Sequence, residues 1–348
     1  MSQINIYEPR TLVAGLNQCR APRKFLSETF FSVVRLFDTY NVDIDVKQGN
    51  QDIAVYVHPL EKGRLVENAG YSTRTVSPCY TKEIKVIRPN DTITRLFGED
   101  YSAPLSANER EQRLLGEALL ELDNRVHRLE EVMAAQALIH GKVHVKGKKK
   151  DYQLDLGYTI GRQKIYLSGD SCWDRKGDPM FDLDAWSKKI SQRAGLAPNI
   201  IICGDKALQA IYNSETVKER LDLRNFHVGE INSAQEQKLS DQGVIYHGRL
   251  APSNIPIYTY GEVYTNPLTG ELEPLIPDDV VLVGCKSAGC QMLYGMIQNL
   301  HSLKARPRFP LSWIAEDGSA RYIQLESAPL PNLYQVDAFI VGHVLSNY

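Results

Sequence analysis

The turn GCKSAGCQ, residues 284 to 291, comes nearest to a catalytic or phosphate-binding pattern. It follows an apolar run and precedes a possible helix, as a phosphate loop does. However, Gly289 is followed by Cys290 and Gln291, so the lysine and the hydroxyl of a Walker A loop are both missing. Cys285 could act as an activated nucleophile, but an inert thiol is the commoner state of such a residue. We therefore expect no nucleotide site at this turn.

Acidic and histidine side chains elsewhere could be considered as metal ligands. Four acids precede a predicted helix: Asp174, Asp178, Asp182 and Asp184. They do not follow the calcium-loop pattern, and capping and turn roles explain them better. His140 and His144 are four residues apart, but Gly141 separates them and no Glu follows His140. We expect no metal site.

Other catalytic signatures are absent from the sequence. It contains no G-x-S-x-G segment and no glycine spacing of a Rossmann turn. These absences favour an assembly or binding role, although an active site built from scattered residues stays open. We expect a protein that is not an enzyme, with no catalytic residue, no cofactor and no metal.

The composition is that of a soluble protein of roughly two domains. Of its 348 residues, 43% are hydrophobic and 24% are charged. A formal net charge of -2 argues against a protein that coats nucleic acid, so any contact with DNA should be weak. The sequence shows no signal peptide and no apolar run of roughly 18 residues, which argues against secretion and against a membrane span. Six cysteines without a C-x-x-C pair predict reduced thiols in a cytoplasmic setting.

The clearest periodic pattern predicts a long helix from about 107 to 140. Ser106 and Glu109 form a capping-box signature before it, and Gly141 is a plausible stop after it. At 1.5 Å per residue this helix would be roughly 50 Å long, which suits a spine better than a coiled coil because strands follow at once. Its core-facing stripe has alternating spacings of four and three: Leu115, Leu119, Leu122, Val126, Leu129 and Met133.

The stretch AGYSTRTVSPCYTKEIKVIRPNDTI, residues 69 to 93, predicts an extended basic hairpin. Its β-branched residues favour strands, while Pro78 and Pro89 exclude an unbroken central strand. Two strands alone bury too little surface to be stable. We therefore expect the packing partner of this stretch on another copy of the chain.

The remaining segments mix helices and strands without a regular βαβ alternation, which predicts an α+β fold. Residues 1 to about 25 read as an arm, and 25 to 38 as a short helix that docks Phe30, Phe31 and Phe37. Further predictions are strands at 42 to 46 and 52 to 59, a hairpin at 142 to 157, a helix at 181 to 195, a strand followed by helices from 199, and strands at 244 to 246, 256 to 260 and 280 to 283, with strand-like segments again at the end.

Taken in order, these segments resemble the major capsid proteins of tailed bacteriophages typified by that of phage lambda. The resemblance covers most of the chain from about residue 25 and is weakest at 157 to 175 and 225 to 245. It is carried by DIAVYVHPLEKGRLVENAGYSTRTVSPCYTKEIKVIRPNDTITRL (52 to 96), LLELDNRVHRLEEVMAAQALIHGK (119 to 142), ALQAIYNSETVKERLD (207 to 222), PDDVVLVG (277 to 284), RPRFPLSW (306 to 313) and YIQLESAPL (322 to 330).

The resemblance implies a Hong Kong 97-type fold and a division of the chain. Residues 1–51 would be an N-terminal arm and the entry to the peripheral domain, and 52–97 an extended E-loop that reaches over the adjacent subunit. Residues 98–199 would be the peripheral domain with spine helix 107–140. Residues 200–305 would form the axial domain around the centre of each hexamer or pentamer, and 306–348 would return to the peripheral domain.

The implied function is a non-catalytic shell protein that self-assembles into hexamers and pentamers of an icosahedral phage head around double-stranded DNA, in the virion capsid. The implied partners are copies of itself, a scaffolding protein, a portal and a decoration protein, with assembly in the bacterial host cytoplasm. Charged side chains of the E-loop are then placed to form ion pairs with the next subunit: Arg64, Arg74, Lys82, Glu83, Lys85 and Arg88. Each exposed pair would contribute only about 0 to 1 kcal/mol, and many repeats would add up.

Two alternatives stay open. The first is a nanocompartment shell of the same fold, which would hold cargo protein instead of a genome. The second is a cytosolic enzyme that uses the turn at 284 to 291.

Overall fold

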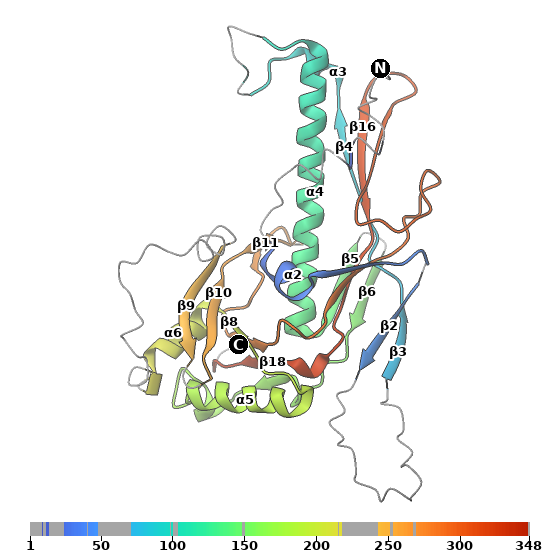
Figure 1. The fold of residues 1–348 in the computed structure, drawn as a ribbon. Helices are drawn as coiled ribbons and strands as arrows, with labels where there is room; N and C mark the ends of the chain where they lie inside the picture. The colour runs from blue at the N-terminus through green and yellow to red at the C-terminus, as the bar shows by residue number, and fades with distance from the viewer. Residues whose placement is uncertain are drawn as a thin grey trace, which may run out of the picture.

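The computed structural model describes residues 24–39, 41–47, 71–97, 104–147, 150–214, 243–250, 253–266 and 269–346, and the separate residues 9, 12, 13, 99, 216 and 217. Its longest element is α4 (Ala107–His140), which runs from the body of the molecule along a projecting arm of strands (Figure 1). One end of α4 therefore lies in the body and the other lies far from it.

Both ends of α4 are fixed by local contacts. The Ser106 hydroxyl accepts from the Glu109 N–H at 3.3 Å, and the Glu109 carboxylate accepts from the Ser106 N–H at 2.8 Å. Gly141 ends the helix with φ of 61°, where a glycine has no steric cost. A Cβ atom at this position would lie 2.1 Å from the Tyr158 ring, so packing as well as backbone conformation requires glycine.

A three-stranded antiparallel sheet covers the outer half of α4. Its order is β15-β16-β4, with β15 at Phe309–Ile314, β16 at Arg321–Ser327 and β4 at Thr81–Ile87. Residues alternate along β4, so Ile87 is buried toward the helix while Ile84 and Val86 are exposed on the other face. A short helix, α3 (Pro89–Ile93), follows β4 and contacts α4.

The pairing of β4 corrects one expectation from the sequence. Residues 69 to 93 do not form one hairpin that waits for another subunit, because β4 pairs along its whole length with β16 of the same chain. The hairpin consists instead of β2 (Val42–Lys47) and β3 (Tyr71–Val76), which pair antiparallel from Val42 with Val76 to Lys47 with Tyr71. The strand expected at 52 to 59 lies outside the described residues.

A six-stranded mixed sheet forms the centre of the body, with the order β7-β18-β13-β8-β10-β9. Its strands are β7 (Lys164–Tyr166), β8 (Ile200–Cys203), β9 (Val244–Leu250), β10 (Ile255–Tyr260), β13 (Val280–Gly284) and β18 (Phe339–His343). In β8, Ile200 and Ile202 point to a core shared with α4, whereas Ile201 and Cys203 point to a core shared with α5 (Pro179–Ala194) and α6 (Asp205–Asn213). Both faces are covered, which explains why this strand is apolar at every position.

Smaller strand pairs complete the fold. In a three-stranded sheet, β14 (Gln291–Tyr294) lies between β1 (Val33–Leu36), which is parallel to it, and β17 (Pro329–Asn332), which is antiparallel. Two further antiparallel pairs are β5 (Lys142–Gly147) with β6 (Lys150–Asp155), and β11 (Val263–Thr265) with β12 (Leu272–Pro274). Short 3-10 turns occur at Gly169–Ser171 and Val336–Ala338. The fold is α+β.

Two further segments differ from the sequence-based expectation. The helix expected at 25 to 38 ends early: α2 spans Phe25–Phe30 and β1 follows it, with Phe30 and Phe31 buried and Phe37 partly buried. After the turn at 284 to 291 the chain enters strand β14 and not a helix. Because β7 and β18 belong to the same sheet as β8, strands from outside 200–305 complete that sheet, and the division into axial and peripheral domains stays a prediction.

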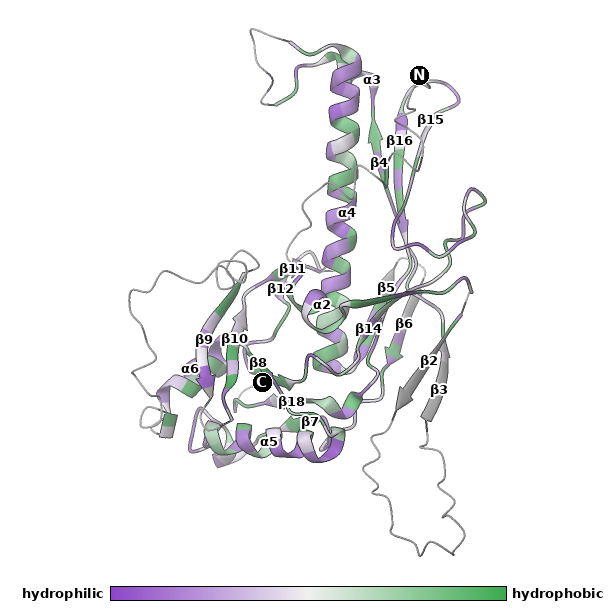
Figure 2. Ribbon diagram, viewed as in Figure 1, coloured by the Kyte–Doolittle hydropathy of each residue, from purple (hydrophilic) through white to green (hydrophobic). Residues whose placement is uncertain are grey.

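The hydrophobic core has separate parts along α4. Leu115, Leu119 and Leu122 pack with Ile323 and Leu325 of β16 in the outer arm. Nearer its C-terminal end, α4 contributes Met133 and the residues that follow to the main core of the body. Hydrophobic segments accordingly concentrate in β8, β10 and the end of α4 that enters the body (Figure 2).

Candidate functional site

The candidate site is the spine helix α4 together with the charged residues that bind it to the strands. Five members of the stripe are buried, and Leu129 is partly buried against the main core. These side chains hold α4 to the outer sheet and to the body. The five buried members are Leu115, Leu119, Leu122, Val126 and Met133.

The residues expected at subunit contacts lie in three different situations. Arg64 is outside the described residues, and for Arg74 the structure gives only its place in β3, opposite Ile44. Arg88 is exposed at the start of α3, where its N–H donates to Asp91 at 2.9 Å. The remaining three, Lys82, Glu83 and Lys85, all lie on β4.

The three charged residues of β4 form ion pairs within the chain. Lys85 pairs with Glu121 of α4, Glu83 lies 3.5 Å from the Arg125 guanidinium, and Lys82 lies 3.5 Å from the buried Glu326 carboxylate. The first two pairs are about half-exposed, so each is worth about 0 to 1 kcal/mol. These weak contacts orient β4 on the helix, and a role of the same side chains between subunits stays a prediction.

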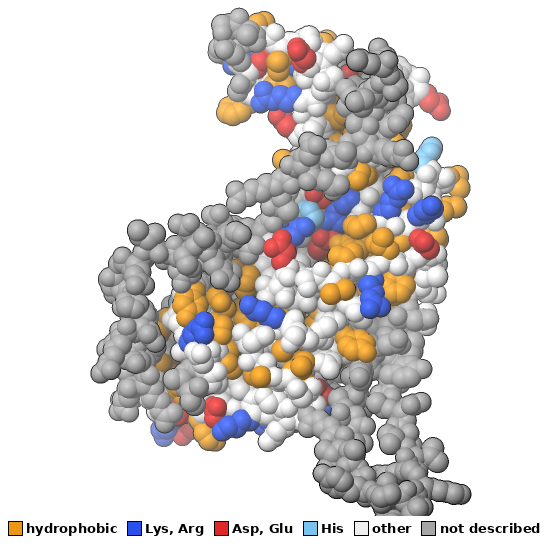
Figure 3. All heavy atoms as spheres, in the orientation of Figure 1, with side chains coloured by type: hydrophobic (Ala, Val, Ile, Leu, Met, Phe, Trp, Pro, Cys, Tyr) orange, Lys and Arg blue, Asp and Glu red, His pale blue; other side chains and the backbone are white. Residues whose placement is uncertain are grey.

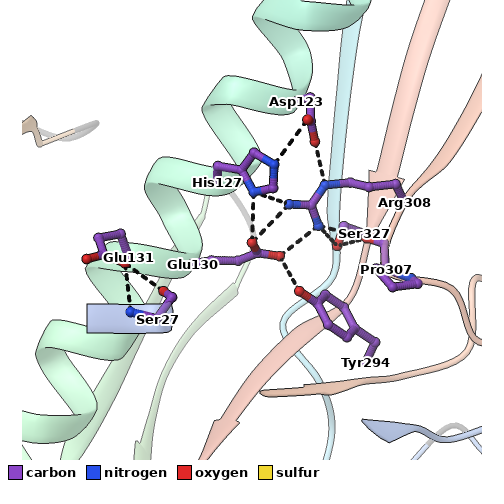
Figure 4. Close-up of polar contacts among 9 residues, drawn as sticks. All are labelled: Ser27, Asp123, His127, Glu130, Glu131, Tyr294, Pro307, Arg308 and Ser327. Carbon is purple, nitrogen blue, oxygen red and sulfur yellow. Dashed lines mark hydrogen bonds and ion pairs between the residues drawn. The ribbon is translucent and has the colours of Figure 1, made fainter. Parts of the chain in front are cut away.

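A buried cluster of charges joins α4 to the strands below the outer sheet (Figure 4). Arg308 precedes β15 and points between two helix carboxylates: its Nε donates to Asp123 at 2.6 Å, and its Nη1 donates to Glu130 at 2.7 Å. His127 lies between the same carboxylates, with each ring nitrogen 3.1 Å from one of them. Tyr294 of β14 donates to Glu130 at 2.7 Å. We call these five residues the charge cluster.

The charge cluster is stabilised by mutual compensation. Burial alone would raise the pKa of Glu130, but hydrogen bonds from His127 and the charge of Arg308 outweigh burial and lower it to about 2. For Asp123, burial is likewise opposed by His127 and Arg308, which lower its pKa. The Arg308 pKa is raised despite its burial because Glu130 lies beside it. The cluster is therefore an ion network that fixes β14 and β15 to the helix.

The next helix residue, Glu131, binds a different element. Its carboxylate accepts from the Leu26 N–H at 2.6 Å, and from the Ser27 N–H at 3.0 Å and hydroxyl at 2.6 Å. These are the free N–H groups in the first turn of α2, whose own N-cap residue makes no side-chain cap. Burial raises the pKa of Glu131 although these donors oppose the shift. Glu131 thus caps α2 from a helix that is distant in the sequence.

The turn at 284 to 291 has the properties of a structural turn. Cys285 is buried and its Sγ lies 3.0 Å from the Ser287 hydroxyl. Burial raises the pKa of Cys290 to about 12, so its thiolate is not populated at neutral pH. The Lys286 N–H donates to Asn199 at 2.9 Å, which ties the turn to the start of β8.

The acids near α5 serve the fold locally. Asp178 is the N-cap and accepts from Met180 at 3.0 Å, and Asp182 accepts from the Trp173 indole at 2.9 Å. Asp174 accepts from Ser346, and Asp184 pairs with Lys188, four residues later in α5. Among the residues that the structure describes, no group of three or more acids, histidines or cysteines is arranged to hold a metal ion.

The two histidines considered as metal ligands lie in different surroundings, His140 partly buried at the end of α4 and His144 exposed on β5. Burial lowers the pKa of His140 to about 4, and nearby Lys164 adds to the shift. The His144 N–H donates to the Gln136 side chain at 3.0 Å, and the His144 ring contacts Gln153 at 2.8 Å.

Within the described ranges, no helix combines the length and apolar character that crossing a bilayer requires.

Sequence reasoning missed the charge cluster, although part of its signal was present. Asp123, His127 and Glu130 follow one another at spacings of four and three, which places them on one face of α4 beside the apolar stripe. Polar residues in phase with a buried stripe indicate a buried network. The partners on β14 and before β15 could not be identified in this way, because they are more than 160 residues away in sequence.

Comparisons with known proteins agree with this architecture over nearly the whole chain. Residues 8–344 match the family described as phage major capsid protein E. The chain is 28% identical to the major capsid protein of Escherichia phage lambda, over 97% of this chain and 98% of the relative. It is 26% identical to the major capsid protein of Enterobacteria phage P21, over 98% of this chain and 100% of the relative.

A solved structure shows the same fold. A prophage protein of Escherichia coli CFT073, described as a capsid protein, superimposes with a TM-score of 0.74 at 20% identity, over 97% of this chain and 98% of that one. The α+β fold is therefore of the Hong Kong 97 type expected from the sequence. Together, the family match and the fold show that this chain belongs to the phage major capsid protein E family and is a structural protein of the phage virion.

Proposed function

We propose that copies of this chain assemble into hexamers and pentamers of an icosahedral head that encloses double-stranded DNA, without catalysing a reaction. The observation that carries the proposal is the exposure of apolar side chains at widely separated parts of an elongated molecule. Phe97, which leads into α4 at the far end of the arm, is 99% exposed. Ile93, four residues earlier in α3, is 70% exposed, so apolar side chains gather at this end of the arm, as they do on surfaces that contact neighbours.

The edge of the central sheet supports the same proposal. β9 is the last strand of that sheet, and Ile245 and Tyr246 on it are exposed. Figure 3 shows hydrophobic side chains gathered at the surface of the body beside β9 and β10. An exposed edge strand offers unpaired backbone groups to another chain, and a monomeric protein normally protects such an edge. We infer that neighbouring subunits cover it in the shell.

The charge of the chain fits a container for DNA. The formal net charge of -2 provides no general excess of cations, so contact with packaged phosphate would be weak and nonspecific. A wall of this kind holds DNA without binding it tightly. A scaffolding protein, a portal and a decoration protein are further partners that we propose from family membership, with assembly in the host cytoplasm.

The two alternatives predict different contents and chemistry. A nanocompartment shell of the same fold would enclose cargo protein, whereas a phage head would enclose nuclease-protected DNA. The family match supports the phage head. The enzyme alternative needs an accessible thiolate at the turn, whereas Cys285 is buried and burial raises the pKa of Cys290 to about 12.

The direct test is assembly of the purified chain, followed by sedimentation and negative-stain electron microscopy. We expect closed shells from the wild type. A variant in which residues 48–70 are replaced by a two-residue Asn-Gly turn should keep the β2–β3 pairing and the thermal melting of the wild type but form no normal shells. The replacement leaves β4 intact, so that its pairing with β16 is kept. Failure of the wild type to form shells would refute the proposal.

A further inference from the structure

We propose that the turn between β14 and β15 of one copy, residues 296–305, docks into a groove beside α4 of a second copy. We call this turn the knob. It is a small hairpin with isolated bridges between Met296 and Ala305 and between Asn299 and Ser302. This inference rests on the proposed function, because it names a contact by which subunits of the shell hold one another.

The knob is a rigid element that presents apolar side chains to solvent. Leu300 at its tip is 95% exposed and Leu303 is 58% exposed. The turn is nevertheless well anchored: the Ser302 N–H donates to the Asn299 carbonyl at 2.9 Å, and the Asn299 amide donates to the buried Glu326 carboxylate at 2.8 Å. At its base, the Ala305 N–H donates to Asp38 at 2.6 Å. A single exposed leucine is ordinary on a protein surface, but one held in place by an anchored turn is suited to fill a pocket of a partner.

The groove lies between α4 and the β11–β12 pair. It consists of two adjoining hollows of about 230 and 270 Å³ that share Val132, Tyr264 and Leu275. Its α4 side runs from Arg128 to His140, roughly 18 Å at 1.5 Å per residue. Each hollow is smaller than the roughly 300 to 1,000 Å³ of a typical small-molecule site, and its apolar floor suits single side chains such as leucine.

The charges of the two surfaces are complementary. The rim of the groove carries the carboxylates of Glu262 and Glu273, with Arg128 on the α4 side. Glu273 is held in place by hydrogen bonds from Tyr264 and Asn266. Two exposed cations follow the leucines: Lys304 lies in the knob and Arg306 lies just beyond it. His301, beside Leu300 at the tip, is exposed as well. An apolar tip followed by cations matches an apolar floor with an acidic rim, and such rim charges select the partner more than they add affinity.

The positions of knob and groove decide the symmetry of the contact. The knob projects to the right of α4 in Figure 1, whereas β11 and β12 lie to its left, as the labels of Figure 2 show in the same view. A knob on one side cannot meet the groove on the other side of the same chain, so docking is head to tail between copies. Repeated head-to-tail contacts close into a ring, as hexamers and pentamers require, whereas a twofold contact would stop at a dimer.

The test is disulfide trapping in the full chain. Leu300→Cys on the knob is combined with Val263→Cys, an exposed residue of β11 that lines the groove. After assembly and mild oxidation with copper phenanthroline, we expect a ladder of bands on a non-reducing gel that passes the dimer and ends at pentamer and hexamer. Each single variant should give only the wild-type background. The matched control pairs Leu300→Cys with Ile160→Cys, a comparably exposed apolar position away from the groove, and should give no ladder.

The outcomes separate the docking from the proposed function. Normal shells of the double variant without a ladder, a ladder that stops at the dimer or trimer, or an equal ladder from the control pair would overturn the docking while leaving the shell intact. Absence of shells from the wild type would refute both. As a second measurement, Leu300→Asp should lower the yield of shells at least tenfold while its melting temperature stays that of the wild type, because the side chain is at an exposed tip.

Discussion

Removal of the buried guanidinium of Arg308 is the most informative perturbation of this fold. Arg308→Met keeps much of the side-chain volume but leaves Asp123 and Glu130 without their arginine. Breaking a buried ion network by removing one partner costs about 3 to 5 kcal/mol. The structure agrees in direction: His127 and Arg308 together lower the Glu130 pKa from 4.5 to about 2 against the effect of burial, which at roughly 1.4 kcal/mol per pKa unit corresponds to about 3 kcal/mol in favour of the ionised form, shared between the two partners.

The loss of stability caused by Arg308→Met should depend on pH in a defined direction. A carboxyl whose pKa is lowered on folding contributes stability that is present above its unfolded value, 4.5 here, and is lost as the pH falls toward about 2. In Arg308→Met, burial would dominate and raise the pKa of Glu130, so ionisation above pH 4.5 would destabilise the variant. The difference in free energy of unfolding between wild type and variant should therefore be large at pH 7 and shrink toward pH 4.

The assay is urea unfolding of dispersed subunits, followed by far-UV circular dichroism at several pH values. The matched control is Arg125→Met on the same helix, because Arg125 pairs with Glu83 and Glu121 at the surface and should cost less than about 1 kcal/mol. The double variant Glu130→Gln with Arg308→Met should recover part of the loss. Equal unfolding of Arg308→Met and Arg125→Met at pH 7 would refute the reasoning that the charge cluster is a buried, interdependent network.

Other substitutions test the remaining contacts of α4. Leu122→Asp should prevent folding, since it buries an unpaired charge in the outer core, and wild-type melting would contradict that placement. Gly141→Ala should destabilise by more than about 1 kcal/mol because of its positive φ and the clash with Tyr158; a smaller change in urea unfolding would argue against the left-handed cap. Glu131→Ala should uncap α2 and speed tryptic cleavage after Lys24, whereas an unchanged cleavage rate would show that this cap does not hold α2.

Local signals predicted much of α4 from the sequence. The range 107 to 140 followed from the capping pair Ser106 and Glu109 and from Gly141, because helix ends depend on residues within one turn of them. The apolar stripe identified its buried face for the same reason, since helical spacing is fixed by geometry. The helix expected at 181 to 195 was visible for the same reason, because Leu183, Trp186 and Ile190 recur at helical spacing, and all three are buried in α5.

Long-range pairings could not be predicted in this way. The strand at 81 to 87 was recognised as extended, yet its partner β16 lies about 240 residues later, and no local rule relates the two. The same limit applies to β2 and β3, whose pairing across 23 intervening residues places the hairpin at 42–76 and not at 69–93. The knob and the groove also depend on tertiary placement, because Leu300 and Tyr264 acquire their positions only when the strands are assembled.

The charge cluster has a mechanical consequence. It occupies the stretch of α4 between the part that packs in the outer arm and the part that packs in the body, so two cores meet there at a polar joint. Hydrogen bonds and ion pairs are directional, whereas apolar packing constrains direction only weakly. The contacts of Glu130 with Tyr294 and Arg308 therefore fix the rotation of the helix relative to β14 and to the residue before β15. The arm is thereby held at a defined orientation to the body at the point where one core gives way to the other.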